Sequence, residues 1–263
     1  MTDEGRDPVH YEIHEKIAYL LIDRPQRRNA LSIATIDALV TAMDRASRDS
    51  SVRVIVVRGS GDRAFSAGLD LKELDQLSRS GQPIPTPMTG LHRNLFEAVQ
   101  ETYKPVIACL NGPAVGAGCE LALACDLRVA ASASYLSLPE ARRGMGANFA
   151  SVMLPRMLPP AVAAHLLYTG DQMSAAEALR WGLYNRVVPL GQLDETTESL
   201  AQRIAANAPL TLTRMKHLSV KTSGLPLSAA LRLDPGPNPY LSEDREEGVR
   251  AYLEQRTPQW QGR

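Results

Sequence analysis

Two acids and two glycine-containing turns are the residues of this sequence whose types and spacing could do chemistry. Residues 111–121 read NGPAVGAGCEL, a glycine-rich turn that includes Glu120 near its end. The turn follows the apolar run 105–110, which predicts a buried strand, and it opens into an apolar helix. Such a turn leaves unpaired backbone N–H groups pointing at one place, where the helix dipole also favours negative charge. We therefore expect a negatively charged group to bind there.

A second fragment of the chain has the same order of elements. Residues 64–70, AFSAGLD, follow a predicted strand over 52–58, and a second acid, Glu140, stands in the triplet LPE at 138–140. Two turns and two acids predict a site that holds a developing oxyanion and moves protons beside it.

The elements that must position these groups alternate between strands and helices. Residues 11–23 predict a hairpin that turns near Glu15 and Lys16, and Ser32 is expected to cap a helix with apolar residues at helical spacing. The β-branched run 52–57 indicates a strand buried on both faces, which is typical of a parallel sheet. Further strands are expected near 127–131 and over 134–138. The pattern predicts an α/β fold.

The C-terminal part of the chain is expected to be mostly helical. A Pro-rich stretch at 234–239 interrupts it and cannot be helical. The predicted helices cover residues 174–181, 193–207, 210–222 and 242–256. We therefore divide the chain into a core over 1–190, which carries the site, and a C-terminal helical region over 191–263.

The segment 78–89 is rich in Pro, Gly and Ser and closely follows the turn at 64–70. Its composition predicts a mobile loop, and its position suggests a lid over the site. The alternative is an inert surface connection.

Composition excludes several classes of function. The 263 residues hold 29 Lys plus Arg and 29 Asp plus Glu, so no overall charge favours nucleic acid or an anionic membrane as a partner. No apolar run approaches the length of about 20 residues that spans a bilayer, and the N-terminus has no signal-like apolar stretch. We expect a cytoplasmic location.

The metal-binding and redox residues are few and scattered. The three cysteines, Cys109, Cys119 and Cys125, match neither a disulfide framework nor a CxxC site, and are expected to be buried thiols. The five histidines show no paired ligand spacing. We predict no metal.

With these motifs in this order, the chain resembles the crotonase family, the enoyl-CoA hydratase/isomerase superfamily. The resemblance rests on RPQRRNAL at 24–31, FSAGLDL at 65–71, KPVIA at 104–108, NGPAVGAGCE at 111–120, ACD at 124–126, LPE at 138–140, TGD at 169–171 and SEDREEG at 242–248. It implies a spiral of ββα units with a C-terminal helical trimerisation region, and a homotrimer or homohexamer. It also implies an acyl-CoA thioester as substrate, with coenzyme A as part of that substrate and no separate cofactor.

The resemblance also implies roles for particular residues. In this family the thioester carbonyl lies between two backbone N–H groups, which correspond to Ala67 and Ala117, although most relatives have glycine where Ala117 stands. Hydratases of the family use two glutamates, corresponding to Glu120 and Glu140, to hold one water over the double bond. Retention of both acids favours an enoyl-CoA hydratase, a hydro-lyase of fatty acid metabolism, which adds water across the 2,3 double bond through an enolate held in an oxyanion hole.

Contacts to coenzyme A are also implied by the family resemblance. Arg27, Arg28 and Lys72 stand where basic side chains could meet phosphates, and the backbone near Ala64 and Asp70 would face the adenine. Arginine pairs well with phosphate, but each of these charges is equally well explained as a solvated surface group. Leu71, Leu74, Met88, Leu91 and Phe149 could line the acyl pocket, but apolar residues at such spacings more often belong to the core.

One departure from the hydratase pattern follows Glu140. The sequence there runs ARRGMGANFAS over 141–151, where hydratases have a small turn that contains Gly-Gly. Asn148 stands where dienoyl-CoA isomerases of the family place a further acid, and its alternative role is a helix N-cap. The alternative reactions are therefore enoyl-CoA isomerisation, CoA-thioester hydrolysis or another crotonase-type reaction.

Three other classes of protein are less consistent with the sequence. A dinucleotide-binding GxGxxG motif would require glycine where Leu121 stands, and Glu120 would face the pyrophosphate. A serine hydrolase based on Ser66 lacks the GxSxG elbow and a paired histidine. A catalytically silent binding member of the family would not need both acids.

Overall fold

The computed structural model describes residues 7–84 and 93–263. The chain begins with a hairpin of β1 (Val9–His14) and β2 (Ile17–Ile22), which pair antiparallel. Glu15 and Lys16 form its turn with positive φ angles of 46° and 69°, the conformation that tight two-residue hairpins require. The predicted hairpin and its turn are confirmed.

The large sheet has six strands in the order β1-β2-β3-β4-β6-β9. From β2 onward all neighbours are parallel. The added strands are β3 (Val54–Gly59), β4 (Val106–Leu110), β6 (Leu127–Ala131) and β9 (Arg186–Val188). Strand β4 is wholly buried, which fits a parallel sheet covered on both faces, as its β-branched and apolar sequence predicts.

A small second sheet lies next to the site and sets its geometry. It contains β5 (Ala114–Val115), β7 (Tyr135–Ser137) and β8 (Gln172–Ser174) in that order. Isolated bridges join Ser66 to Ala114 and Leu31 to Leu69, so the turn at 64–70 lies between this sheet and the segment that precedes the first helix.

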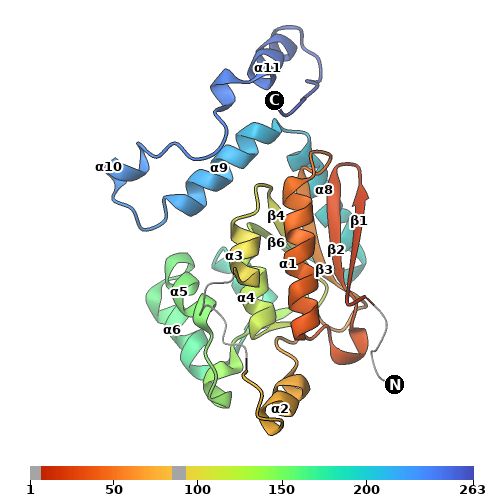
Figure 1. Cartoon of the computed structure of the whole chain (residues 1–263), viewed down its shortest axis with the longest axis vertical. Helices are drawn as coiled ribbons and strands as arrows, with labels where there is room; N and C mark the ends of the chain where they lie inside the picture. The colour runs from red at the N-terminus through yellow and green to blue at the C-terminus, as the bar shows by residue number, and fades with distance from the viewer. Residues whose placement is uncertain (1–6, 85–92) are drawn as a thin grey trace.

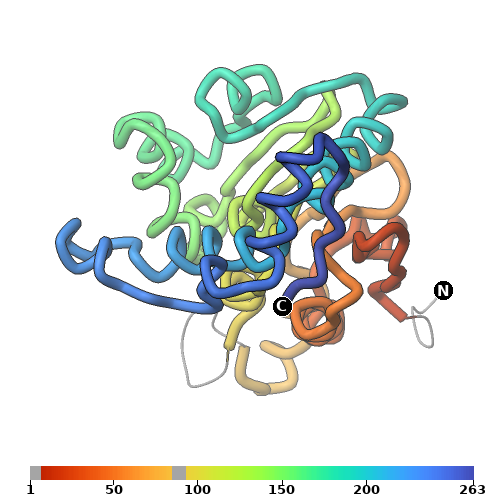
Figure 2. Tube along the Cα trace, turned by 90° about the horizontal axis from the view of Figure 1, so that it is seen from above, coloured from red at the N-terminus to blue at the C-terminus, as the bar shows by residue number. Residues whose placement is uncertain are grey.

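Helices cover both faces of the large sheet. One face packs against α1 (Ile33–Arg48), α3 (Leu95–Gln100) and α4 (Ala117–Ala124), and Ser32 caps α1 through Thr35 N–H as predicted. In Figures 1 and 2, the β1–β2 hairpin lies on the opposite side of the molecule from α5 and α6. The remaining core elements are η1 (Pro25–Arg27), α2 (Leu71–Arg79), η2 (Pro139–Arg143), α5 (Asn148–Met157), α6 (Pro160–Thr169) and α7 (Ala175–Arg180).

The opposite face of the sheet is covered by α8 (Leu190–Ala205). Its residues Leu193 and Ala201 are fully buried and share a cluster with Ile17 and Val54 of the sheet. This helix belongs to the predicted C-terminal region, whereas in the structure it packs on the core. The amphipathic helix supplies the apolar face that a sheet buried on both sides needs.

The chain after α8 projects away from the sheet, toward the top of Figure 1. It contains α9 (Pro209–Lys221), α10 (Leu227–Ala230), η3 (Pro239–Leu241) and α11 (Glu243–Leu253). The last residues return to the core. Arg53 donates to the carbonyl oxygens of both Ala205 and Trp260 at 2.9 Å, and the Trp260 indole donates to the Ala206 carbonyl at 2.7 Å.

Two other predictions concern particular segments of the chain. The predicted lid over 78–89 begins in the last residues of α2, and residues 85–89 of it lie outside the described residues, so the lid stays a prediction. The three cysteines are free and buried, as predicted. In the described ranges, no helix is long and apolar enough to cross a membrane.

Candidate active site

The N-terminus of α4 forms the first half of the site. Gly116 precedes the helix with φ 57° and ψ −128°, a backbone conformation that favours glycine, and its N–H donates to the Ser137 carbonyl at 2.9 Å. Ala117 is the first helical residue, and its N–H has no hydrogen-bond partner in the part of the chain that the structure describes. A Cβ added to Gly116 would lie 2.8 Å from Glu140 Oε1. The open end of α4 and the second acid are therefore adjacent, as the sequence predicted.

The turn at 64–70 presents its backbone groups alternately to two neighbours. Ser66 pairs with β5, because its carbonyl accepts from Val115 N–H at 2.9 Å and its N–H donates to the Pro113 carbonyl at 3.3 Å. The N–H of Ala67 faces the other way and donates to the Arg28 carbonyl at 3.0 Å. The predicted donor Ala67 is therefore already occupied, and the structure does not offer its N–H to a ligand.

The N–H of Leu69, on the side of this turn that faces Ala117, stays open. Leu31 donates to the Gly68 carbonyl at 2.7 Å and accepts from Asp70 N–H at 3.0 Å, so Leu69 between them directs its own N–H away from Leu31. That N–H has no partner within residues 7–84 and 93–263. A Cβ added to Gly68 would lie 3.2 Å from Ala117 N, which places the two turns side by side. The open N–H next to that of Ala117 is therefore that of Leu69 and not that of Ala67.

Ser66 has a packing role in the same turn. It is fully buried, its hydroxyl accepts from Gly68 N–H at 3.3 Å, and a Cβ added to Gly118 would lie 2.7 Å from its Cβ. The close approach of Ser66 to α4 leaves no room for a substrate at its hydroxyl. The serine-hydrolase alternative has no support in this geometry.

Glu120 is a buried acid whose orientation α5 fixes. Its Oε1 accepts from the backbone N–H of Ala150 at 2.9 Å, and only 3% of the residue is exposed. Burial, opposed by the N–H groups of Ala150 and Phe149 and assisted by the charge of the nearby Glu140, raises the pKa of Glu120 to about 7. A carboxyl with such a pKa can both give and take a proton near neutral pH.

Glu140 is buried on η2 but is held more loosely. Its Oε2 atom is buried without a hydrogen-bond partner among the described residues. Burial raises the pKa of Glu140, and its own backbone N–H and the Arg143 charge oppose that shift. The two predicted acids thus lie in one buried region, each with a pKa above its ordinary value, and one oxygen of Glu140 is left for a further donor such as water.

The start of α5 forms an aromatic wall beside the acids. The rings of Phe149 and Phe96 are both buried, with centroids 5.0 Å apart. Asn148 is the first residue of α5 and Ala147 precedes it as the cap residue, so the N-cap interpretation of Asn148 differs from the structure. Of the other predicted pocket residues, Leu71 is exposed, Leu74 is half-buried, and Met88 and Leu91 lie outside the described residues.

The residues predicted to bind coenzyme A fall into two groups. Arg27, Arg28 and Lys72 have exposed side chains, and their role stays a prediction. The Ala64 carbonyl instead accepts from the side-chain amides of Asn29 at 2.8 Å and Asn111 at 3.1 Å. Its oxygen is thus already paired, which the sequence analysis missed because both partners are distant in the chain.

Asp70 has a structural role that the sequence did not reveal. Its carboxylate forms a buried ion pair with Arg24 at 2.9 Å and caps α2 by accepting from Lys72 N–H at 3.2 Å. Its backbone N–H and carbonyl bond to Leu31 and Leu74. The hydrogen bonds and charge of Arg24 lower the pKa of Asp70 although burial opposes this shift. Neither its backbone nor its side chain is open to an adenine ring.

One group of side chains brings potential metal ligands together. His14, Glu15 and Glu198 have ligand atoms within 4.8 Å of one another at the tip of the β1–β2 hairpin. The group includes none of the predicted site residues, and two of its three members are exposed.

Comparisons with known proteins agree with this fold. The family described as enoyl-CoA hydratase/isomerase matches residues 12–263. Carnitinyl-CoA dehydratase from Salmonella typhi is 37% identical over 267 residues, covering 98% of this chain and 99% of that protein.

Solved structures give the same result. Enoyl-CoA hydratase from Mycobacterium tuberculosis H37Rv superposes with a TM-score of 0.88 at 32% identity, covering 98% of this chain and 100% of that one. Enoyl-CoA hydratase from Bacillus anthracis gives a TM-score of 0.85 at 29% identity, with 97% and 100% covered. The chain therefore belongs to the enoyl-CoA hydratase/isomerase family and has the crotonase fold.

Proposed function

We propose that the protein is a hydro-lyase that adds water across the 2,3 double bond of an acyl-CoA thioester and catalyses the reverse dehydration. The observation that carries the proposal is the arrangement of two buried acids beside two open backbone N–H groups. Glu140 Oε1 lies against Gly116, the residue before the Ala117 donor, and Glu120 lies in the first turn of the same helix.

The two N–H groups stabilise the charge that develops on the thioester oxygen. The carbonyl accepts from Leu69 and Ala117, and the dipole of α4 adds to the effect. Each such donor typically stabilises the transition state by about 3 kcal/mol. Since the donors are main-chain atoms fixed by neighbouring strands, little reorganisation is needed when the enolate forms.

The two acids move the protons of the reaction. Water lies between Glu120 and Glu140, its oxygen bonds to Cβ, and the proton it loses passes to the carboxylate form of one acid. The π electrons of the double bond move into the enolate, whose Cα then takes a proton from the acid form of the other. In total, one water is added to the substrate. The two acids together carry one proton before the reaction and one proton after it. Their raised pKa values permit one proton to be shared near neutral pH.

A second candidate is dehydration of carnitinyl-CoA, the reaction named for the Salmonella relative. The match over nearly the whole chain supports it. Isomerisation and thioester hydrolysis remain alternative outcomes. A cytoplasmic location belongs to the same proposal.

A panel of acyl-CoA thioesters tests the reaction class. Enoyl-CoA substrates of several chain lengths and carnitinyl-CoA are incubated with the protein, and the products are identified by mass. Gain of one water by an enoyl-CoA or loss of one water by carnitinyl-CoA supports the proposal. An unchanged mass with a moved double bond indicates an isomerase, and free coenzyme A indicates a hydrolase.

Substitution of the acids tests their roles. We expect Glu120→Gln and Glu140→Gln each to lower kcat by at least about a hundredfold, since one general acid–base step contributes about 10²–10⁴. Thioester affinity, measured by calorimetry with a saturated acyl-CoA, should stay within a few fold. Near-full activity of Glu120→Gln would remove the two-acid mechanism and point to isomerisation through Glu140 alone.

A further inference from the structure

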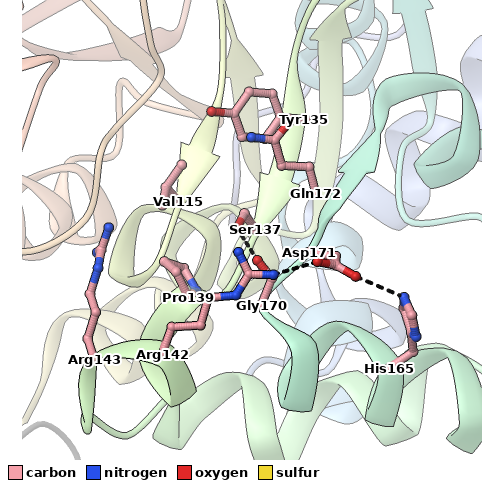
Figure 3. Close-up of a pocket in the computed structure, with 10 residues that line it drawn as sticks. All are labelled: Val115, Tyr135, Ser137, Pro139, Arg142, Arg143, His165, Gly170, Asp171 and Gln172. Atoms are coloured by element: carbon pink, nitrogen blue, oxygen red, sulfur yellow. Dashed lines mark hydrogen bonds and ion pairs between the residues drawn. The ribbon is translucent and has the colours of Figure 1, made fainter.

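A pocket of about 660 Å³ lies beside the turn η2 that carries Glu140. Figure 3 shows Arg142 at its centre, between Pro139 and Asp171. The Arg142 guanidinium donates through Nε to the Thr169 carbonyl at 2.6 Å and pairs with Asp171 Oδ1 at 2.5 Å. The side chain of Arg142 on η2 thus binds the segment 169–171. This segment is the TGD motif, to which the proposed mechanism assigns no role.

Gly170 brings this segment into close contact with the turn. It has a positive φ of 65°, and a Cβ added to it would lie 3.0 Å from Pro139 Cα, so only glycine permits this approach. The Gly170 carbonyl accepts from the Ser137 hydroxyl at 3.1 Å, while the Ser137 carbonyl accepts from Gly116 N–H. The segment 169–171 is therefore tied both to η2 and to the strand that holds the start of α4.

We propose that Arg142 and Asp171 are positioning residues for Glu140. This inference rests on the proposed function, in which Glu140 moves a proton. In that proposal Glu140 acts through its carboxyl, and Oε2 of the carboxyl has no protein partner in the described chain. Its direction therefore depends on the backbone of η2, and the contacts of Arg142 fix that backbone against the end of α6.

Because the Arg142–Asp171 ion pair is exposed, its effect on the position of Glu140 can be measured separately from its effect on the stability of the fold. The side chains of Arg142 and Asp171 are 57% and 50% exposed, and exposed pairs stabilise a fold by at most about 1 kcal/mol. His165 lies 3.4 Å from the second oxygen of Asp171 and is also exposed. A change at either residue of the pair should leave the protein folded, whereas a displacement of about 1 Å at a reacting group can lower a rate about a hundredfold.

The experiment compares Arg142→Ala, Asp171→Ala and the double variant on the best substrate of the panel. We expect each single variant to lower kcat about tenfold with KM changed less than twofold, and the double variant to be no slower than the slower single one. Such non-additivity indicates that the two side chains act as one unit. Asp171→Asn, which keeps an oxygen acceptor, should regain part of the lost rate.

Asp194→Ala is the matched control. It breaks an ion pair between the exposed Asp194 and the half-buried Arg58 on the face of the sheet that α8 covers, so it should keep kcat unchanged, and its Tm is compared with those of the test variants. Unchanged kcat in Asp171→Ala, or additive effects in the double variant, would overturn the proposal. Absence of turnover by the unmodified protein on every thioester would instead overturn the proposed function, so the two failures are distinguishable.

Discussion

At the scale of single residues, the proposed donors to the thioester oxygen are the main-chain N–H groups of Leu69 and Ala117. A side-chain substitution can therefore affect them only through its bulk or through the backbone geometry. Ala117 is a sensitive position for a test, because proline is tolerated as the first residue of a helix yet has no N–H. A substitution there can remove one donor and keep the fold.

We expect Ala117→Pro to stay folded and to lose at least about a hundredfold in kcat/KM, the share of one oxyanion donor. Ala117→Gly keeps the N–H and should retain activity within about tenfold. Circular dichroism checks the fold of each variant, and kcat/KM is measured on the best thioester. Unimpaired turnover by a folded Ala117→Pro protein would show that the carbonyl is held elsewhere.

The raised pKa of Glu120 predicts a dependence of stability on pH. The folded-state pKa of about 7 lies above the ordinary value of 4.5, so the native state favours the protonated acid and loses stability as pH rises from 4.5 to 7. The loss amounts to about 3 kcal/mol above pH 7. Glu120→Gln cannot ionise and can still accept from Ala150 N–H. In urea unfolding it should match the unmodified protein at pH 4 and exceed it at pH 8; equal stabilities at pH 8 would contradict the assignment.

The site residues differ in how far the sequence could predict them. Glu120 and Ala117 follow from a local pattern of strand, turn and helix, and their positions agree with the prediction. The choice between Ala67 and Leu69 depends on the bridge between Leu69 and Leu31, which belong to distant segments. The burial of Asp70 likewise depends on Arg24. Pairings between distant segments leave no periodic trace in the sequence, so the partners of Ala67 and Asp70 could not be predicted from it.

At the scale of elements, a buried ion pair attaches α9 to the core. Lys216 Nζ lies 2.7 Å from Asp126 Oδ2 and donates to the carbonyls of Val99 and Lys104 at 3.1 and 3.0 Å. Burial lowers the pKa of Lys216, and Asp126 opposes this shift. The helix is thus held by a charged group rather than by an apolar face.

Lys216→Ala should lower the free energy of unfolding by about 3 kcal/mol, because it leaves buried acceptors without their donor. Lys221→Ala on the same helix is the control, since that residue pairs with Glu101 on the surface and should change stability by less than about 1 kcal/mol. Urea titrations of both variants check the difference. Similar losses in the two variants would argue against a special role for Lys216.

Strands and helices with a clear hydrophobic pattern were predicted well. The pattern did not predict which surface each of them packs against. The strands 52–57 and 105–110 and the helices after residue 174 agree with the structure within a few residues. The division at residue 190 differs because α8 pairs with the sheet through Leu193 and Ala201, and an amphipathic pattern does not reveal which apolar surface it covers.

At the scale of the whole molecule, the C-terminal region exposes several large apolar side chains, a feature that is typical of an interaction surface. The side chains concerned are each more than 60% exposed: Met215, Leu227, Leu231, Tyr240, Leu241, Tyr252 and Leu253. They belong to the part of the chain that projects from the core in Figure 1. Contact with further copies of the chain would cover them.

We therefore expect a homotrimer or homohexamer in solution, as the family resemblance implies. Sedimentation velocity at micromolar concentration measures the mass directly. Leu231→Glu places a charge in the exposed apolar set and should shift the population toward smaller species, while the surface change Glu12→Gln should not. A stable monomer of the unmodified protein would contradict the prediction.

The contacts of Arg53 make the C-terminal region a loop whose two ends lie together on the core. One arginine holds the carbonyls of Ala205 and Trp260, so the segment leaves the core and rejoins it at the same place. A loop whose ends are already fixed together can change length at a small entropic cost, because closure entropy grows only slowly with loop length. We therefore expect insertions and deletions in this segment to change the stability of the core little and to act mainly on the exposed surface that the segment carries.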